Sequence, residues 1–238
     1  GFGGFEGVVK GKSELYTYLK NNKKFAFINP DDKLQVEKTQ DLETIPFSTD
    51  LKLIDVNPFV KISFNNLKIQ SNLIGKYNYT NIAVACTIGN YFNISSTKIK
   101  EAIESYFPTN NRSQIIEKVA NRVILDAYNA NPSSMKAALE NFNSLKDKYK
   151  TVVLGDMFEL GNESLKEHQS IVDLATNLNF TNVFLVGEHF YKTNSTLKIF
   201  KDFNSFNRFI KNNPLKQQSI LIKGSRGMRL ERLLDIIE

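Results

Sequence analysis

The sequence is short of the side chains that build disulfides and zinc sites. Its 238 residues include one cysteine, Cys86, and two histidines, His168 and His189. One cysteine cannot form an internal disulfide, and these three residues are too few for a zinc site of the Cys/His type. Cys86 ends the apolar run of residues 82–86, so we expect a buried, unreactive thiol in a reducing compartment. Neither histidine stands in a local motif typical of a Ser/His/Asp triad.

Long apolar runs are also missing. No stretch is long enough to span a bilayer, and the first residues do not form a signal peptide. We therefore expect no membrane insertion and a cytoplasmic location. Hydrophobic residues make up 41% of the chain and charged residues 24%, which is typical of one or two folded domains with a real core.

Charge of one sign is not concentrated anywhere. The 31 basic and 25 acidic residues give a net charge of +6, and the lysines are spread along the chain. Nucleic-acid binding would favour basic residues clustered with stacking aromatics. We expect a solvated, lysine-rich surface, with a preference for anionic small substrates as the second interpretation and no nucleic-acid partner.

A phosphate-binding loop of the form G-x-x-x-x-G-K-[S/T] is absent. The triplet Gly11-Lys12-Ser13 resembles its end, but Glu6 occupies the place of the first glycine, and no strand pattern precedes it. The chain also begins at Gly1 rather than at a methionine. We interpret this start as a fragment boundary and expect these 238 residues alone to be inactive.

The first half of the chain mixes helices and short strands. Apolar spacing predicts a helix over residues 12–20, a strand over 25–28, antiparallel strands within 42–69, and helices over 78–92 and 96–106. Residues 107–111, with a proline and two asparagines, are the best candidate for a linker.

The second half alternates regularly between strands and helices. We predict strands over residues 122–126, 151–154, 182–186 and 219–222, and helices over 132–145, 163–178, 203–211 and 228–237. Such alternation predicts a parallel sheet covered on both faces. Ligands of these sheets bind at the carboxyl ends of the strands.

Three polar motifs stand at those strand ends. Residues 126–132 read Asp-Ala-Tyr-Asn-Ala-Asn-Pro, residues 155–161 read Gly-Asp-Met-Phe-Glu-Leu-Gly, and residues 223–229 read Lys-Gly-Ser-Arg-Gly-Met-Arg. Each has an alternative without function: a helix cap by Asn131, a plain Asp/Gly turn, and a helix cap by Ser225 with a solvated Arg226. His168, beyond the second motif, is by itself typical of a surface or capping histidine.

Together with the run Gly3–Tyr16, the segment Gly75–Asn81 and Arg112, these motifs resemble the Mur ligases. Within that family the resemblance is to the branch that joins D-alanyl-D-alanine to UDP-MurNAc-tripeptide. It covers nearly the whole chain but only the second half of the family's architecture. It implies ATP and Mg²⁺ as cofactors: ATP phosphorylates a carboxylate, and an amine attacks the resulting acyl phosphate.

The resemblance also implies roles for single residues in the first half. Lys12 matches a lysine that the family carbamylates to hold a magnesium ion. Asn78 and Asn81 match the pair that faces adenine, since amides offer both a donor and an acceptor. Tyr77 stands where the family usually has histidine, and its ring can still stack on the base.

In the second half, Arg112 matches an arginine directed to the ATP phosphates, and Asp126 an aspartate directed to ribose. From the residues themselves we expect Ser225 and Arg226 to anchor the dipeptide carboxylate, because arginine and helix-start N–H groups bind carboxylates. Asn129 and Asn131, at the end of the first strand, could face the same crevice.

The sequence thus predicts an α/β protein in two parts. Residues 1–108 would form the C-terminal portion of a Mur-type ATPase domain, and residues 109–238 a Rossmann-like parallel-sheet domain. The implied function is ATP-dependent amide ligation in peptidoglycan-precursor synthesis. The alternatives are another amide ligase, such as a relative of folylpolyglutamate synthase, or a non-catalytic nucleotide- or peptide-binding module.

Overall fold

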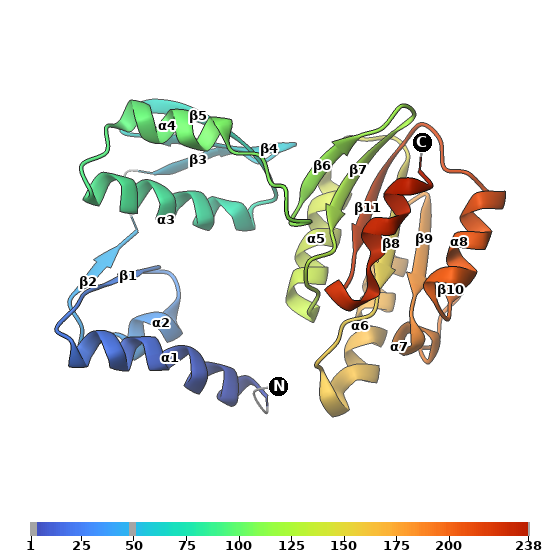
Figure 1. Cartoon of the computed structure of the whole chain (residues 1–238), viewed down its shortest axis with the longest axis horizontal. Helices are drawn as coiled ribbons and strands as arrows, with labels where there is room; N and C mark the ends of the chain where they lie inside the picture. Colours follow the sequence, from blue (N-terminus) through green and yellow to red (C-terminus); the bar gives the residue numbers. More distant parts are fainter. Residues whose placement is uncertain (1–3, 48–50, 238) are drawn as a thin grey trace. The chain divides into compact units, whose positions relative to one another are not determined.

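The computed structural model describes residues 4–47 and 51–237. They divide into two compact units. The first contains the residues up to Asn72 together with Lys76–Tyr106, and the second contains Leu73–Gly75 and the residues from Phe107 onwards. Figure 1 shows the elements of each unit.

The first unit opens with a helix that is longer than the sequence predicts. α1 spans Phe5–Asn21, so it begins seven residues before the predicted start at Lys12, and none of its residues is buried. The triplet Gly11-Lys12-Ser13 therefore lies inside a helix rather than in a strand–loop–helix context. Gly3, where the family resemblance begins, lies outside the described residues.

Among the described residues, five strands and three helices follow α1 up to Ser105, and of these only the last two residues of β5 belong to the second unit. These are β1 (Ala26–Ile28), α2 (Lys33–Lys38), β2 (Thr44–Pro46), β3 (Lys52–Asp55), β4 (Phe59–Phe64), β5 (Leu67–Ile74), α3 (Tyr77–Tyr91) and α4 (Ser96–Ser105). The prediction of antiparallel strands within residues 42–69 is right for β3 and β4 but wrong for β2, which pairs in parallel with β1. Periodicity cannot give the direction of a pair, because that depends on where the partner strand lies. Residues 48–50 of that stretch lie outside the described residues.

The second unit is an α/β domain with a central six-stranded sheet. Its strands are β6 (Gln114–Glu117), β7 (Asn121–Asp126), β8 (Lys150–Gly155), β9 (Asn182–Val186), β10 (Lys198–Phe200) and β11 (Gln218–Lys223). Their order is β10-β9-β8-β11-β7-β6, and all neighbours are parallel except β6, which runs antiparallel to β7. The predicted parallel sheet is confirmed. β6 and β10, both at the edges, were not predicted.

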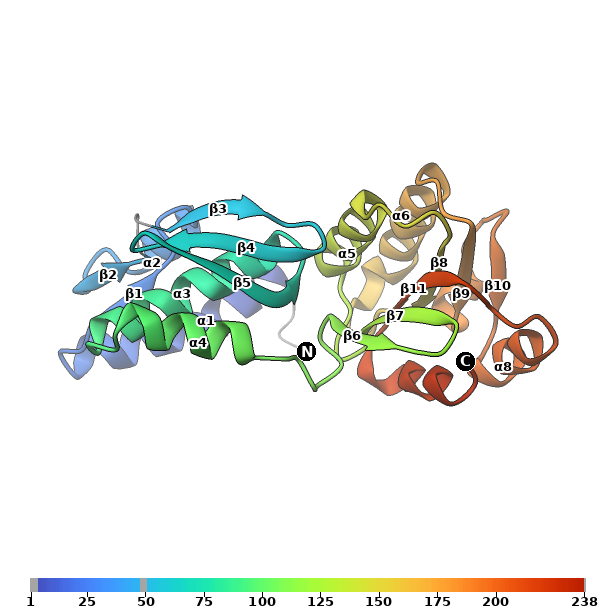
Figure 2. The same cartoon turned by 90° about the horizontal axis from the view of Figure 1, so that it is seen from above.

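Helices cover both faces of this sheet (Figure 2). α5 (Pro132–Ser144) and α6 (Ser164–Asn177) lie on one face, and α8 (Phe203–Asn212) lies on the other with the C-terminal segment. The central strands are consequently buried almost from end to end, as expected of parallel strands packed on two sides.

The end of the chain differs from the prediction. Instead of one α-helix over residues 228–237, there are two 3₁₀ segments, Arg226–Met228 and Leu230–Asp235. Arg229 separates them in the left-handed conformation, with φ of 50°. A left-handed residue cannot continue a right-handed helix, and the break directs the fully buried Leu230 and Leu233 into the core.

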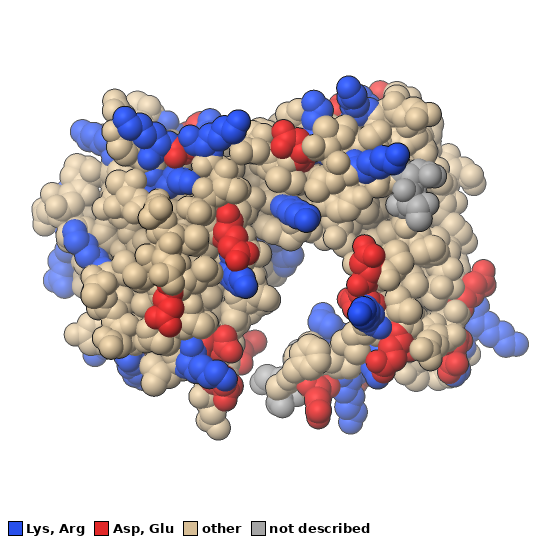
Figure 3. All heavy atoms as spheres, turned by 180° about the vertical axis from the view of Figure 1, so that it is seen from behind, with Lys and Arg blue, Asp and Glu red and all other residues tan. Residues whose placement is uncertain are grey.

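No helix among the described residues is long and apolar enough to cross a membrane. On the face drawn in Figure 3, lysine and arginine side chains are interspersed with aspartate and glutamate. Cys86 is fully buried, and burial raises the pKa of its thiol to about 12, which confirms the prediction of an inert cysteine.

Candidate active site at the carboxyl edge of the sheet

A buried ion pair joins the ends of two neighbouring strands. Lys223 and Asp126 are the last residues of β11 and β7 and are partners in the sheet register. Lys223 Nζ donates to Asp126 Oδ2 over 2.6 Å, and the two side chains are 2% and 17% exposed. The same ammonium reaches the carbonyl oxygen of Asn129, at 3.3 Å. The pair therefore holds the loop after β7 against β11.

The second carboxylate oxygen of Asp126 is also engaged. Oδ1 accepts a hydrogen bond of 3.2 Å from the backbone N–H of Ser113, in the segment before β6. Asp126, which the family resemblance directs to ribose, thus has a protein donor on each oxygen. Each oxygen has a further lone pair with which it could accept a hydrogen bond from a ligand.

Two arginines and a tyrosine meet at this edge. The guanidinium carbon of Arg112 lies 4.1 Å from the ring centre of Tyr128, and that of Arg226 lies 5.4 Å from the same ring. Both arginines are exposed, and the ring is 37% exposed. The sequence predicted Arg112 and Arg226 as separate ligand contacts. The tertiary structure places them on one aromatic ring.

Ser225 connects the loops that follow β8 and β11. Its hydroxyl oxygen accepts a 3.0 Å hydrogen bond from the N–H of Phe158, and its own N–H donates to the carbonyl of Asp156 over 3.1 Å. The alternative of a Ser225 helix cap is wrong, because the side chain forms no hydrogen bond with the following 3₁₀ turn. The side chain instead bonds across to the loop after β8. The residue is buried, at 5% exposure, so substrate would have to reach its hydroxyl from the edge.

The side chains of Asn129 and Asn131 form hydrogen bonds with the backbone at the start of α5. Asn131 forms a capping box: its Oδ1 accepts from the N–H of Ser134, and Ser134 Oγ accepts from the N–H of Asn131. Asn129 Oδ1 accepts from the N–H of Ala130. The capping interpretation of Asn131 is confirmed, and its Oδ1 is occupied by that cap.

Asp156 acts as a cap for a helix that the sequence analysis did not predict. In the first turn of α7 (Glu188–Tyr191), the N–H groups of His189 and Phe190 each donate to one oxygen of the Asp156 carboxylate over 3.0 Å. Gly187 makes this approach possible, because a Cβ there would lie 2.2 Å from the carboxyl carbon of Asp156. Asp156 is therefore a structural residue, buried to 2% exposure.

His168 is fully buried beside Asp156 rather than at the surface. Its Nε2 accepts from the N–H of Met157 at 3.0 Å, so that nitrogen carries no proton. Nδ1 is then the donor, and it lies 2.6 Å from the carbonyl of Ser164. Burial lowers the pKa of His168, although the Ser164 carbonyl and the Asp156 carboxylate, 3.7 Å away, act in the opposite direction. The histidine is neutral and ties the loop after β8 to α6.

His189 completes this cluster. Its ring stacks on His168 with centres 5.2 Å apart, and its Nδ1 lies 3.1 Å from the hydroxyl of Ser164. Sequence reasoning missed the whole cluster, because its members come from three separate elements and no local motif joins them. A buried hydrogen-bonded cluster of this kind supports the site loops rather than forming a triad.

The remaining predicted residues belong to the first unit. Asn78 and Asn81 lie in the first turns of α3, and Asn81 Nδ2 donates to Asn78 Oδ1 over 2.9 Å. Tyr77 opens the helix and is 40% exposed. Lys12 lies on the exposed side of α1. Asn78 and Asn81 are thus in contact with each other, and their role toward adenine stays a prediction.

The described residues contain no ready-made cluster of metal ligands. Within residues 4–47 and 51–237, no group of three histidine, cysteine, aspartate or glutamate side chains could hold a metal ion. Even as a carbamate, Lys12 would supply the oxygen ligands of one residue only. Magnesium takes six oxygen ligands, so the remainder would come from nucleotide phosphates, water or other residues.

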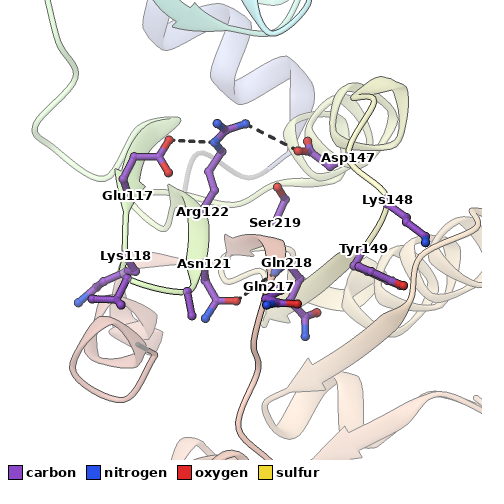
Figure 4. Close-up of a pocket in the computed structure, with 12 residues that line it drawn as sticks. Glu117, Lys118, Asn121, Arg122, Asp147, Lys148, Tyr149, Gln217, Gln218 and Ser219 are labelled. Carbon is purple, nitrogen blue, oxygen red and sulfur yellow. Dashed lines mark hydrogen bonds and ion pairs between the residues drawn. The ribbon is translucent and has the colours of Figure 1, made fainter.

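A cavity of about 370 Å³ lies at the opposite, amino edge of the same sheet (Figure 4). The guanidinium of Arg122 there pairs with Glu117 at 2.9 Å and with Asp147 at 3.7 Å. This arginine is already compensated by two carboxylates. At the carboxyl edge, by contrast, neither Arg112 nor Arg226 forms an ion pair with any described residue. The carboxyl edge is the better anion site.

The six-stranded sheet and the helices on both of its faces define a Rossmann-like α/β domain. Residues 111–226 match the family model described as "Mur ligase, glutamate ligase domain". The second unit therefore contains a domain of the Mur ligase family.

Within that family, the relatives named UDP-N-acetylmuramoyl-tripeptide–D-alanyl-D-alanine ligase are similar to this chain. The Bacillus subtilis protein is 29% identical over 99% of the chain and 56% of its own length. The Rickettsia prowazekii protein is 32% identical over 77% of the chain and 39% of its own length. The crystal structure of MurF ligase from Thermotoga maritima in complex with ADP matches with a TM-score of 0.81 and 21% identity, over 99% of the chain and 57% of that structure. The chain spans about half the length of these relatives.

Proposed function

We propose that this chain is part of an ATP-dependent ligase that joins D-alanyl-D-alanine to UDP-MurNAc-tripeptide in the cytoplasm, during peptidoglycan-precursor synthesis. The observation that carries the proposal is the carboxyl edge of the second unit. There, two arginines without an acidic partner among the described residues meet on one aromatic ring, and the Lys223–Asp126 pair lies at the same edge, in a domain of the Mur ligase family. The similar relatives carry the name of this activity.

The reaction would proceed through an acyl phosphate. The terminal phosphoryl group of ATP is transferred to the substrate carboxylate and ADP leaves. The dipeptide amine then attacks the acyl carbon, so the amide bond forms while phosphate departs with the bonding electrons. Such chemistry depends on aligning the reactants and stabilising charge on the phosphoryl oxygens.

The exposed arginines fit these demands. Arg112 would face the ATP phosphates, and Arg226 would pair with the free carboxylate of the dipeptide, a partner that a guanidinium can bind with two parallel hydrogen bonds. Ser225 would stabilise the dipeptide site from its buried side, because its hydroxyl oxygen accepts a hydrogen bond from the loop after β8. Asn129, at the same edge, could contact the dipeptide through its exposed side chain.

Residues of the first unit would serve the nucleotide. The Asn78–Asn81 pair offers amide donors and acceptors to adenine, and the exposed ring of Tyr77 beside it can stack on the base. Lys12 would carry a carbamate. We propose Mg²⁺ as the cation that accompanies the nucleotide. Because the 238 residues contain no G-x-x-x-x-G-K-[S/T] loop, we also propose that they do not turn over ATP alone.

The test is a ligation assay on a fusion protein in which a segment carrying the phosphate-binding loop of a Mur ligase precedes this chain. Phosphate release should depend on both UDP-MurNAc-tripeptide and D-alanyl-D-alanine, and glutamate should not replace the dipeptide. Arg226→Ala should raise the Michaelis constant for the dipeptide and leave that for ATP and the melting temperature unchanged. Arg229→Ala, which removes an equal exposed charge three residues away, is the matched control. Equal use of glutamate would contradict the proposal.

A further inference from the structure

The ring of Tyr128 is shared by two cations from distant parts of the chain. Arg112 stands in the segment before β6, Arg226 follows β11, and Tyr128 follows β7. Their guanidinium carbons lie 4.1 Å and 5.4 Å from the ring centre, both within the range of a cation–π interaction. The two arginines are thus no farther apart than the sum of these distances.

The backbone reinforces this arrangement on one side. The N–H of Tyr128 donates to the carbonyl of Asn111, over 3.2 Å, and Asn111 directly precedes Arg112. The guanidinium is planar and stacks on an aromatic face, so the ring limits the directions in which Arg112 can point. Arg226 follows the buried Ser225, whose hydrogen bonds fix the start of its loop.

No acidic side chain among the described residues compensates the charge of the two arginines. Neither guanidinium has a carboxylate partner within the part of the chain that the structure describes. The nearest candidate from the same edge, Asp126, is bound by Lys223 and by the Ser113 N–H. Two like charges repel, and the negative face of the ring offsets only part of that repulsion. An anion between or beside the guanidiniums would remove the rest.

We infer that Tyr128 is a positioning residue that couples the two arginines. Its ring orders the side chain of Arg112, which would bind phosphate, together with that of Arg226, which would bind the dipeptide carboxylate. The assignment of Arg112 to phosphate and of Arg226 to the dipeptide carboxylate rests on the proposed function. The coupling itself does not rest on it. It requires only that both guanidiniums stay in contact with the Tyr128 ring when they bind anions.

The experiment follows the arginine Nε–Hε signals of the 238-residue chain by NMR. Arg112→Lys and Arg226→Lys assign the two signals. The chain is titrated separately with inorganic tripolyphosphate and with D-alanyl-D-alanine. In the wild type, both signals should show the ring-current shift of Tyr128, and tripolyphosphate should move both.

Three variants separate the ring from its surroundings. Tyr128→Leu should weaken the binding of tripolyphosphate by about tenfold and broaden both arginine responses, the size expected for losing cation–π support at a partly exposed site. Tyr128→Phe keeps the ring and should behave as the wild type. Tyr149→Leu is the matched control: it removes a ring that is 47% exposed, with Lys148 Nζ 5.1 Å from its centre, at the amino edge of the same sheet (Figure 4).

The inference is overturned if Tyr128→Leu leaves tripolyphosphate binding unchanged, or if it affects one arginine only. Should Tyr128→Leu fail to fold, the wild-type titration decides: a phosphate titration that moves one arginine signal and not the other excludes coupling. Failure of the proposed function looks different. In that case D-alanyl-D-alanine would move neither signal of this chain, and the protein that also carries a phosphate loop would not ligate it, while tripolyphosphate would still move both signals.

Discussion

Lys223 and Asp126, the last residues of β11 and β7, form a hydrogen-bonded ion pair with a distance of 2.6 Å. The carboxyl-edge loops of these two neighbouring strands begin directly after the pair. Because Lys223 is only 2% exposed, its charge has been taken out of water and depends on this partner. The pair fixes the base from which the loops carrying Tyr128 and Arg226 extend.

Removing one member should therefore be costly. Lys223→Met keeps the length of the side chain but leaves Asp126 unpaired, and we expect a loss of about 3 kcal/mol in the free energy of unfolding. Urea denaturation of the second unit measures it. Lys166→Met, which breaks the exposed ion pair with Glu163, should cause no measurable change. A stable Lys223→Met protein would show that the pair is dispensable.

Gly187 should be intolerant of any side chain. It has a φ of 134°, and a Cβ would lie 2.2 Å from the Asp156 carboxyl group, so Gly187→Ala must displace the cap of α7. We expect a loss of about 3 kcal/mol from backbone strain and the broken cap together. The matched control is Gly161→Ala, where φ is 55° and nothing lies within 4 Å of the added methyl group. It should cost about 1 kcal/mol, from the left-handed conformation alone. Equal effects in thermal unfolding would contradict the capping role of Asp156.

His168 should make the protein less stable in mild acid. Its pKa is lowered in the folded state, chiefly by burial, from the ordinary histidine value of 6.5, so the unfolded chain takes up the proton first as the pH falls. The free energy of unfolding should be fully retained above pH 6.5 and should decline below it until the folded-state pKa is passed.

The measurement is urea denaturation from about pH 7.5 to about pH 5, because histidine titrates in this range. His168→Gln, whose amide oxygen can accept the Met157 N–H but cannot titrate, should remove this part of the decline. Asp156 and His189 are the ionisable groups that face His168 and remain in the variant. An unchanged pH profile in the variant would assign the decline to other groups.

The asparagine pair of α3 should affect the nucleotide and not the dipeptide. In a ligation-competent protein, Asn81→Ala removes a donor to Asn78 and a contact proposed for adenine, so the Michaelis constant for ATP should rise by about tenfold. The constant for D-alanyl-D-alanine should stay the same. Asn90→Ala, an exposed asparagine near the end of the same helix, serves as the control. A shift in the dipeptide constant alone would mean that the pair is misassigned.

Much of the second unit was predictable because its signals are local. Runs such as Val123–Leu125 and the Asn131 cap followed by Pro132 act over a few residues, and they predicted β7 and α5 close to their observed bounds. The short edge strands β6 and β10 and the helix α7 were not predicted, since segments of three or four residues form only with support from their neighbours.

The sequence by itself determined the alternation of strands and helices, the burial of Cys86, and the placement of Asp126, Ser225 and Arg226 at strand ends. These features follow from hydrophobic periodicity and turn chemistry, which depend on adjacent residues. Only the tertiary structure decided that Ser225 bonds to Phe158 rather than capping its own turn, that His168 lies buried against Asp156, and that Arg112 and Arg226 share the ring of Tyr128. Each of these contacts joins elements that are distant in the chain, and parallel strand pairing brings them together at one edge of the sheet.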